Sequence, residues 1–153
     1  MFNQVTVVDN FFENYHEILE EKLRDKNFPF YINFHTVRDY KIFDTPNTQD
    51  SPQFTHVFIK DGQENSSDYR GIYPIQFKLS ELLKKELTPL RVKLNLTYPQ
   101  PNFPDGNYNS PHQDYDNKTN VLTCIYYVND SDGDTIIFGP DMEIVQRISR
   151  SEE

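Results

Sequence analysis

The sequence is poor in several residue types, and each shortage excludes a class of structure. It has no tryptophan and one cysteine, Cys124, so it cannot form an internal disulfide, and nothing in it requires an oxidising compartment. No apolar run approaches the roughly 20 residues needed to cross a bilayer. The opening residues, Met1 to Gln4, lack the charged and apolar regions of a secretory signal. We therefore expect a cytoplasmic protein with no membrane partner.

Basic residues are also scarce. The chain has 15 Lys and Arg against 24 Asp and Glu, which gives a formal net charge of -9. A surface of this sign repels phosphate backbones, and the sequence has no basic run that would attract them locally. We therefore expect no nucleic-acid partner.

Aromatic residues are abundant by contrast. The 12 Phe and 10 Tyr favour β-structure, because large flat side chains pack well across neighbouring strands. A length of 153 residues predicts one domain with a sizeable core. We expect a single domain over residues 1–153, with a support region at 1–90 and a β-rich core at 91–153.

Hydrophobic periodicity locates the expected elements. Helical spacing predicts one helix beginning near residue 11 and ending near residues 25–27, and a second at 74–87, which Pro89 follows. The strand-like segments are 5–8, 28–43, 53–60, 91–97, 121–129, 135–138 and 142–148. Helices first and short strands afterwards predict an α+β fold with a β-sandwich or barrel core.

The main chemical motif is His112-Gln113-Asp114. In an extended segment, a histidine and a carboxylate two residues apart point to the same side, so both can contact one metal ion. Two histidines and one carboxylate on one face of the metal form the site of non-heme Fe(II) oxygenases. The triplet therefore predicts two of these three ligands.

Residues 98–138 resemble the prolyl-4-hydroxylase-like family of Fe(II)- and 2-oxoglutarate-dependent dioxygenases. The likeness covers about a quarter of the chain. It lies in the H-x-D triplet, in the segment Leu122-Thr123-Cys124-Ile125-Tyr126-Tyr127-Val128-Asn129, and in the turn and strand from Asp132 to Phe138. The resemblance implies a double-stranded β-helix, or jelly roll, with N-terminal support helices. It also implies Fe(II) and 2-oxoglutarate as cofactors, allows ascorbate, and leaves a peptide or a small molecule as the substrate.

The resemblance also implies roles for individual residues. His112 and Asp114 would be metal ligands, and Tyr127 would bind the distal carboxylate of 2-oxoglutarate. Tyr98 would line the cosubstrate pocket, and Tyr108 would shape the substrate entrance. Thr123 and Ile125 share a strand face with Tyr127 and would form the wall of the same pocket.

One part of the family's site is not found in the sequence. The family has a distal histidine followed by Arg or Lys, yet no histidine follows His112 here. We therefore expect a C-terminally truncated oxygenase with open sheet edges, which would allow a homodimer. Among the remaining histidines, His16 is expected on the solvent side of a helix, and His35 and His56 are expected to have structural roles. Of these two, His56 is the better substitute ligand. The residues considered as a replacement base are Lys93, Arg147 and Arg150.

Two alternatives to an iron-dependent oxygenase site follow from the same residues. The chain could be a metal-free jelly-roll binding module that has lost catalysis and uses its aromatic pocket for a ligand. A nucleophilic role for Cys124 is disfavoured, because we expect this cysteine to lie buried in mid-strand without a neighbouring base.

Overall fold

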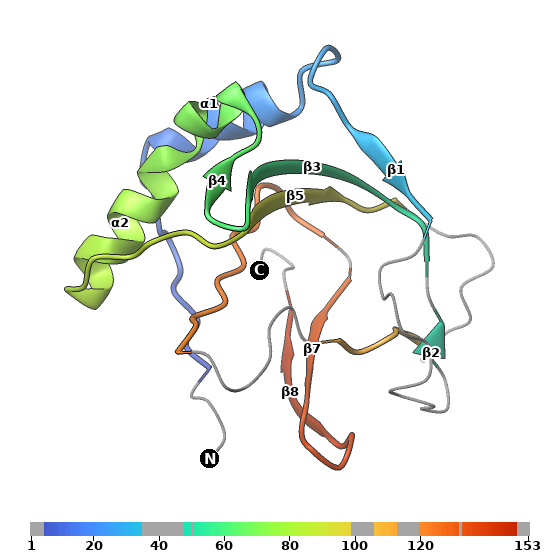
Figure 1. Cartoon of the computed structure of the whole chain (residues 1–153). Coiled ribbons are helices and arrows are strands. Elements are labelled where there is room, and N and C mark those ends of the chain that lie inside the picture. The colour runs from blue at the N-terminus through green and yellow to red at the C-terminus, as the bar shows by residue number, and fades with distance from the viewer. Residues whose placement is uncertain are drawn as a thin grey trace.

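The structure, a computed structural model, describes residues 5–34, 48–49, 51–98, 106–112, 120–131 and 133–149 (Figure 1). Two α-helices, a 3-10 helix and eight short strands occur in these parts of the chain. In order they are α1 (Tyr15–Leu23), β1 (Tyr31–Asn33), β2 (Thr48–Gln49), β3 (Gln53–Lys60), β4 (Gln63–Glu64), η1 (Ser67–Gly71), α2 (Tyr73–Leu83), β5 (Val92–Leu96), β6 (Tyr108–Asn109), β7 (Thr135–Phe138) and β8 (Ile144–Ile148).

The main sheet is antiparallel and is built around β3. Phe54 of β3 lies opposite Ile32 of β1 on one side and Leu96 of β5 on the other, so β1 and β5 are its edges among the described residues. The β3–β4 hairpin turns at Asp61 and Gly62, both with positive φ. Asp-Gly is favoured in such two-residue turns because both positions tolerate that conformation.

Two smaller pairs complete the strands. The β7–β8 hairpin is antiparallel, with Thr135 opposite Ile148 and Ile136 opposite Arg147, while β2 and β6 pair in parallel. Figure 1 shows α1 and α2 together beside the main sheet and the β7–β8 hairpin below it. These elements give mixed helical and mostly antiparallel sheet content, and the main sheet is open at both edges over the residues described.

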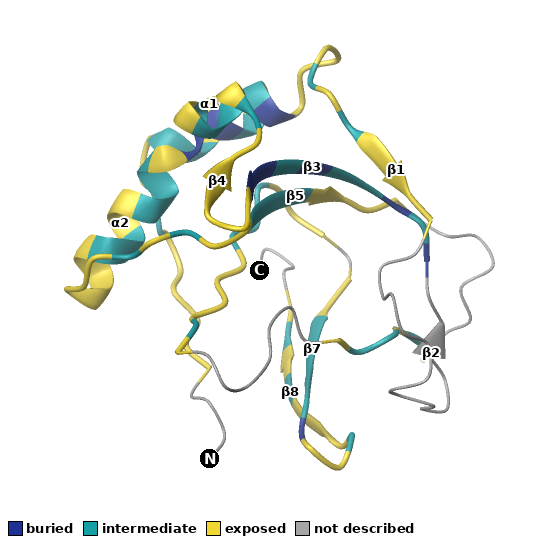
Figure 2. Ribbon diagram, viewed as in Figure 1, coloured by how far each residue is buried: buried dark blue, intermediate teal, exposed yellow. Residues whose placement is uncertain are grey.

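The core lies where the helices meet β3. Its buried side chains are Leu19 and Leu23 of α1, Phe58 of β3 and Ile72 at the start of α2. Tyr126 and Val128 pack against this cluster from the segment 120–131. Figure 2 shows the buried residues concentrated on β3 and on the inner side of α1, while the outer helix surfaces are exposed.

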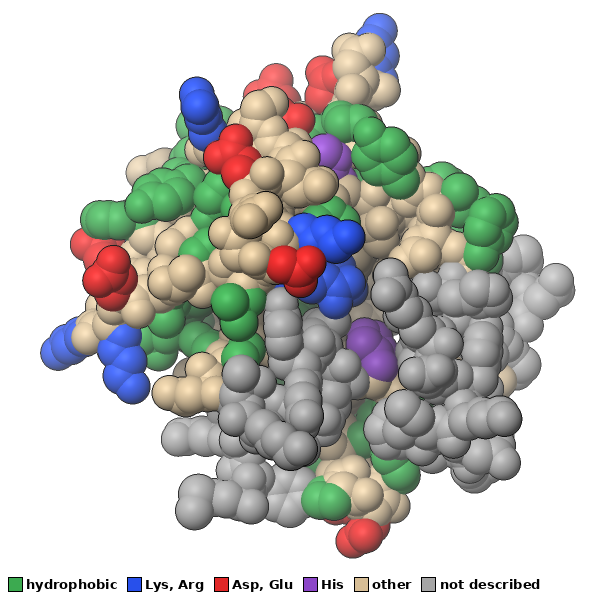
Figure 3. All heavy atoms as spheres, viewed as in Figure 1, with side chains coloured by type: hydrophobic (Ala, Val, Ile, Leu, Met, Phe, Trp, Pro, Cys, Tyr) green, Lys and Arg blue, Asp and Glu red, His purple; other side chains and the backbone are tan. Residues whose placement is uncertain are grey.

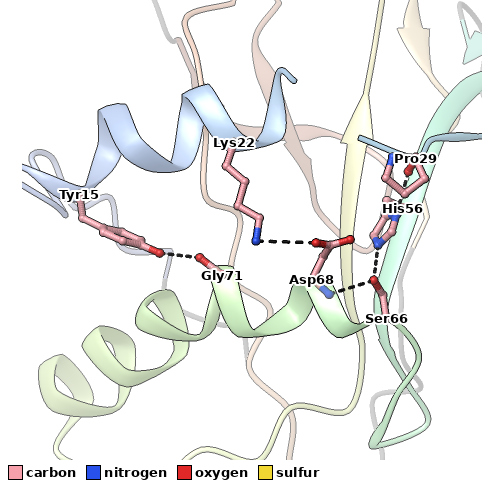
Figure 4. Close-up of polar contacts among 7 residues, drawn as sticks. All are labelled: Tyr15, Lys22, Pro29, His56, Ser66, Asp68 and Gly71. Atoms are coloured by element: carbon pink, nitrogen blue, oxygen red, sulfur yellow. Dashed lines mark hydrogen bonds and ion pairs between the residues drawn. The ribbon is translucent and has the colours of Figure 1, made fainter. Parts of the chain in front are cut away.

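A buried histidine joins the sheet to the neighbouring loops (Figure 4). His56 is only 4% exposed, and its Nδ1 donates to the carbonyl of Pro29 at 2.7 Å. Its Nε2 accepts from the hydroxyl of Ser66 at 2.8 Å, and Ser66 in turn accepts from the amide of Asp68. Both ring nitrogens are therefore used within the fold, which assigns His56 a structural role and argues against its use as a substitute metal ligand.

Several expected elements agree with the structure. The strands at 53–60 and 135–138 occupy the predicted ranges, and β5 lies within the predicted 91–97. The second helix was predicted to continue to Leu87, but it ends at Leu83, because Lys84 takes up the left-handed conformation. Its first turn contains Pro74. Proline is tolerated there because a backbone N–H in the first turn of a helix has no intrahelical acceptor, so its absence costs no hydrogen bond.

Two expected strands are not formed. Residues 5–8 and 121–127 are neither helix nor strand, although both runs are rich in β-forming side chains. A strand requires a hydrogen-bonded neighbour, which side-chain propensity does not supply. The expected extended segment 28–43 is described only to residue 34 and contains β1. No helix in the described ranges combines the length and the apolar character that a membrane span requires.

We predict that His56→Phe lowers the free energy of unfolding by about 1–3 kcal/mol. The phenyl ring retains the packing against Phe28 and Phe58, but Pro29 and Ser66 lose their hydrogen-bond partner. Urea unfolding followed by circular dichroism measures the change. The control is His112→Phe, at an exposed position, where we expect a change within roughly 0.5 kcal/mol. Equal losses in both variants would contradict the structural role of His56.

Candidate functional site

The predicted metal pair begins in the segment 106–112. Gly106, with a φ of +81°, forms the turn that leads into β6, and Pro111 restricts the backbone directly before His112. His112 is exposed. Asp114 lies outside the described residues.

A hydrogen bond of His112 favours one ring nitrogen for ligand binding. Its Nδ1 lies 3.3 Å from the carbonyl oxygen of Ser110. A carbonyl only accepts, so Nδ1 carries the proton in the neutral ring and the lone pair is on Nε2. Metal-binding histidines commonly have this arrangement, in which a hydrogen bond from one nitrogen orients the other toward the metal. His112 therefore fits the role of a metal ligand.

Tyr108 attaches the His112 segment to the β7–β8 hairpin. Its hydroxyl accepts a hydrogen bond from Nη2 of Arg147 at 2.7 Å, and its ring packs edge-on against Phe138 at 5.8 Å between centroids. Arg147 also lies 3.8 Å from a carboxylate oxygen of Asp134. Tyr108 was expected to shape the substrate entrance. Its contacts in the structure instead attach it to Arg147 and Phe138 of the hairpin.

Tyr127 contacts the same hairpin through a different residue. Its hydroxyl forms a hydrogen bond with the hydroxyl of Thr135 at the start of β7. Thr135 and Ile136 are neighbours in a strand, so they point to opposite faces, and Arg147 lies opposite Ile136 in the register. Tyr127 and Tyr108 are therefore bound through opposite faces of the β7–β8 hairpin.

The opposite faces of the β7–β8 hairpin decide whether Arg147 can reach a cosubstrate carboxylate bound by Tyr127. The guanidinium of Arg147 faces Tyr108 and Asp134, not the face on which Thr135 meets Tyr127. Lys93 lies half-buried on β5, opposite Val57 of β3, and takes part in a further polar or ring interaction. Arg150 lies outside the described residues.

The other expected pocket residues are largely exposed. Tyr98 is 44% exposed, with its ring 6.0 Å from that of Phe54. Ile125 is 58% exposed, and Thr123 is exposed too. Two hollows of about 330 and 400 Å³ occur beside α2, not at these residues. In Figure 3, apolar side chains lie on the surface over the helices.

His16 was expected to face solvent, and this prediction is wrong. It is half-buried, and its Nδ1 lies 2.6 Å from the hydroxyl of Tyr126. Phe11 and Phe12 contact the same tyrosine ring. These contacts attach the segment 120–131 to the first helix, although 110 positions separate His16 from Tyr126. Helical spacing alone could not reveal the contact, because it does not identify which distant residue covers a helix face.

No group of three His, Cys, Asp or Glu side chains suited to a metal ion occurs within the described ranges. Of the histidines, His56 uses both ring nitrogens within the fold, and His35 lies outside those ranges. The residues that fit a metal are therefore His112, from its tautomer, and Asp114, from the sequence motif alone.

Cys124 is exposed as a residue, so the expectation of a buried side chain is wrong. Neighbouring atoms still remove part of the water around the sulfur, and this desolvation raises the pKa of the Cys124 thiol. A raised pKa lowers the thiolate fraction at neutral pH, and the thiolate is the reactive form.

We predict slow alkylation of Cys124 near neutral pH. Because its thiol pKa is raised, the reaction rate with iodoacetamide should increase with pH about a midpoint above about 8.5, the ordinary thiol value. The control thiol is Thr88→Cys in a Cys124→Ser background, at an exposed loop position. A midpoint for Cys124 at or below that of the control thiol would refute the prediction.

We also predict that Arg147→Gln loosens the His112 segment. Loss of the bond to Tyr108 should accelerate amide hydrogen exchange in residues 106–112 by roughly threefold, a modest factor because the contact is solvent-exposed. Mass spectrometry of peptic fragments measures the rate. Arg24→Gln, which removes a surface pair with Glu20 on α1, should leave the exchange of 106–112 unchanged. An identical response to both substitutions would count against the anchoring role of Arg147.

Comparisons of the chain with protein-family models, with curated proteins and with solved structures found no match in any of the three. The chemistry assigned to this chain therefore depends on its own residues. The strongest of these are the H-x-D triplet, the tautomer of His112, and the two tyrosines held by the β7–β8 hairpin.

Proposed function

We propose that this chain is an Fe(II)- and 2-oxoglutarate-dependent oxygenase of the prolyl-4-hydroxylase type, or a part of one. The observation that carries the proposal is the H-x-D triplet followed at short distance by Thr123-x-x-Tyr126-Tyr127-x-Asn129. An H-x-D triplet alone is common by chance, whereas the combination at this spacing is specific. The fold proposed with it is a double-stranded β-helix with N-terminal support helices.

The tautomer of His112 supports the proposal. A neutral imidazole that donates from Nδ1 to the Ser110 carbonyl has its Nε2 lone pair available to a divalent metal. His112 would hold the metal together with a carboxylate oxygen of Asp114. These hard and borderline ligands suit Fe(II) without the electron donation of a thiolate.

The remaining residues would act on the cosubstrate. Bound Fe(II) and 2-oxoglutarate would together supply the oxidising chemistry, and the protein would bind, orient and shield the reactants. The hydroxyl of Tyr127, already paired with Thr135, could donate to the distal carboxylate of the cosubstrate. Tyr98, Thr123 and Ile125 would border the same pocket, and all three are exposed.

The proposal assigns two protein ligands and no third. Among the 153 residues no histidine follows His112, so the family's distal histidine has no counterpart after the triplet. Two ligands bind a metal more weakly than three, and the proposed site is therefore one of low affinity in this chain. The proposed substrate is a peptide or a small molecule. The proposed location is the cytoplasm, consistent with a single cysteine.

We predict that the chain binds Fe(II) through His112 and Asp114. Mn(II) serves as an oxygen-stable substitute, because imidazole and carboxylate ligands suit it too, and electron paramagnetic resonance reports the unbound ion. His112→Gln or Asp114→Ala should lower the affinity at least about tenfold, since even the loss of an outer partner of a ligand costs about that much.

The matched control is Asp130→Ala, which changes the same residue type at an exposed position elsewhere and should leave metal binding intact. Equal binding by all three variants, or no binding by the unaltered chain at millimolar metal, would reject the oxygenase. The metal-free binding module would then be the better description of the chain.

A further inference from the structure

Residues 121–125 have an unusual combination of sequence and structure. They form neither helix nor strand, and no hydrogen bond of theirs occurs in the described structure (Figure 1, the orange segment that leads toward β7). Their sequence, Val-Leu-Thr-Cys-Ile, nevertheless has high β-propensity and contains no glycine or proline. The segment therefore has the side chains of a strand, and its backbone has no hydrogen-bond partner among the residues that the structure describes.

The surroundings hold this segment at the surface. Tyr126 and Val128, which follow it directly, pack against the core cluster of Leu19, Leu23, Phe58 and Ile72. Leu122 is 55% exposed and Ile125 is 58% exposed, while Thr123 and Cys124 are exposed too. Natural proteins protect a strand edge of this kind with lysine, proline or a covering element. Residues 121–125 contain neither lysine nor proline.

We propose that residues 121–125 pair as an antiparallel strand with the same residues of a second copy of this chain. A two-fold axis at Thr123 places Thr123 opposite itself, Val121 opposite Ile125, and Leu122 opposite Cys124. Every cross-strand pair is then either threonine with threonine or apolar with apolar, and both kinds are favourable. The segment is thus self-complementary over all five residues.

The absence of charge makes this segment suited to pairing with a second copy. Each chain carries a formal net charge of -9, so two copies repel each other over most of their surfaces. Residues 120–129 contain no charged side chain, and their pairing brings no like charges into opposition. The exposed edge strand β1 is shorter, with three residues, and would supply fewer backbone hydrogen bonds. Strand pairing uses backbone groups, so the face that carries Thr123, Ile125 and Tyr127 remains open to a ligand.

Disulfide trapping tests both the pairing and its register. In a Cys124→Ser background, Thr123→Cys should form an intermolecular disulfide under mild oxidation roughly tenfold faster than Thr88→Cys, the same substitution at an exposed loop residue. A mixture of the unaltered chain with the Leu122→Cys, Cys124→Ser variant should form the mixed dimer in preference to either symmetric one. Thr123→Cys that reacts no faster than Thr88→Cys would overturn the proposal.

Charge substitution provides an independent measurement. Thr123→Glu places two carboxylates opposite each other, so analytical ultracentrifugation should show a loss of dimer, whereas Thr88→Glu should retain it. Mixing Thr123→Glu with Thr123→Lys should restore association, because opposite charges then meet at the axis. A monomer at all concentrations for the unaltered chain, or association that Thr123→Glu leaves intact, would show that this segment does not join two copies.

Discussion

The packing of α1 onto β3 is the contact on which the rest of the structure depends. Leu19 and Leu23 of α1 meet Phe58 of β3 in the most buried part of the molecule, and Ile72 extends this cluster to α2. The same cluster receives Tyr126 and Val128 from the second half of the chain. Removing water from these apolar side chains therefore fixes the helices, the main sheet and the segment after the H-x-D triplet in one step.

The β7–β8 hairpin has a comparable role for the candidate site. Through Arg147 and Phe138 it contacts Tyr108, four residues before His112, and through Thr135 it contacts Tyr127. Strand alternation directs these contacts to opposite faces of one narrow element. The hairpin thus determines the spacing between the proposed metal ligand and the proposed cosubstrate tyrosine.

Local structure was more predictable from the sequence than tertiary contacts were. The segments 53–60 and 135–138 were predicted correctly as β3 and β7, and in the structure each has a partner strand that pairs with it. Residues 121–129 have an equally strong pattern, but a ladder also requires a neighbour, which no local rule identifies. The contact of His16 with Tyr126 joins a helix to a distant irregular segment, which no local pattern identifies. The position of Arg147 on the hairpin face opposite Thr135 depends on the register of β7 and β8. The H-x-D motif was recognisable because its chemistry is encoded within three residues.

The hydrogen bond between His16 and Tyr126 has a consequence for the order in which the molecule assembles. Because 110 positions separate the two residues, the first helix completes its packing only after most of the chain has left the ribosome. Until then the aromatic side chains of Phe11 and Phe12 lack the ring that covers them. Contacts of such long sequence separation slow folding, since a large loop must close before any energy is gained. Phe11 and Phe12 are therefore side chains whose burial is completed late in synthesis.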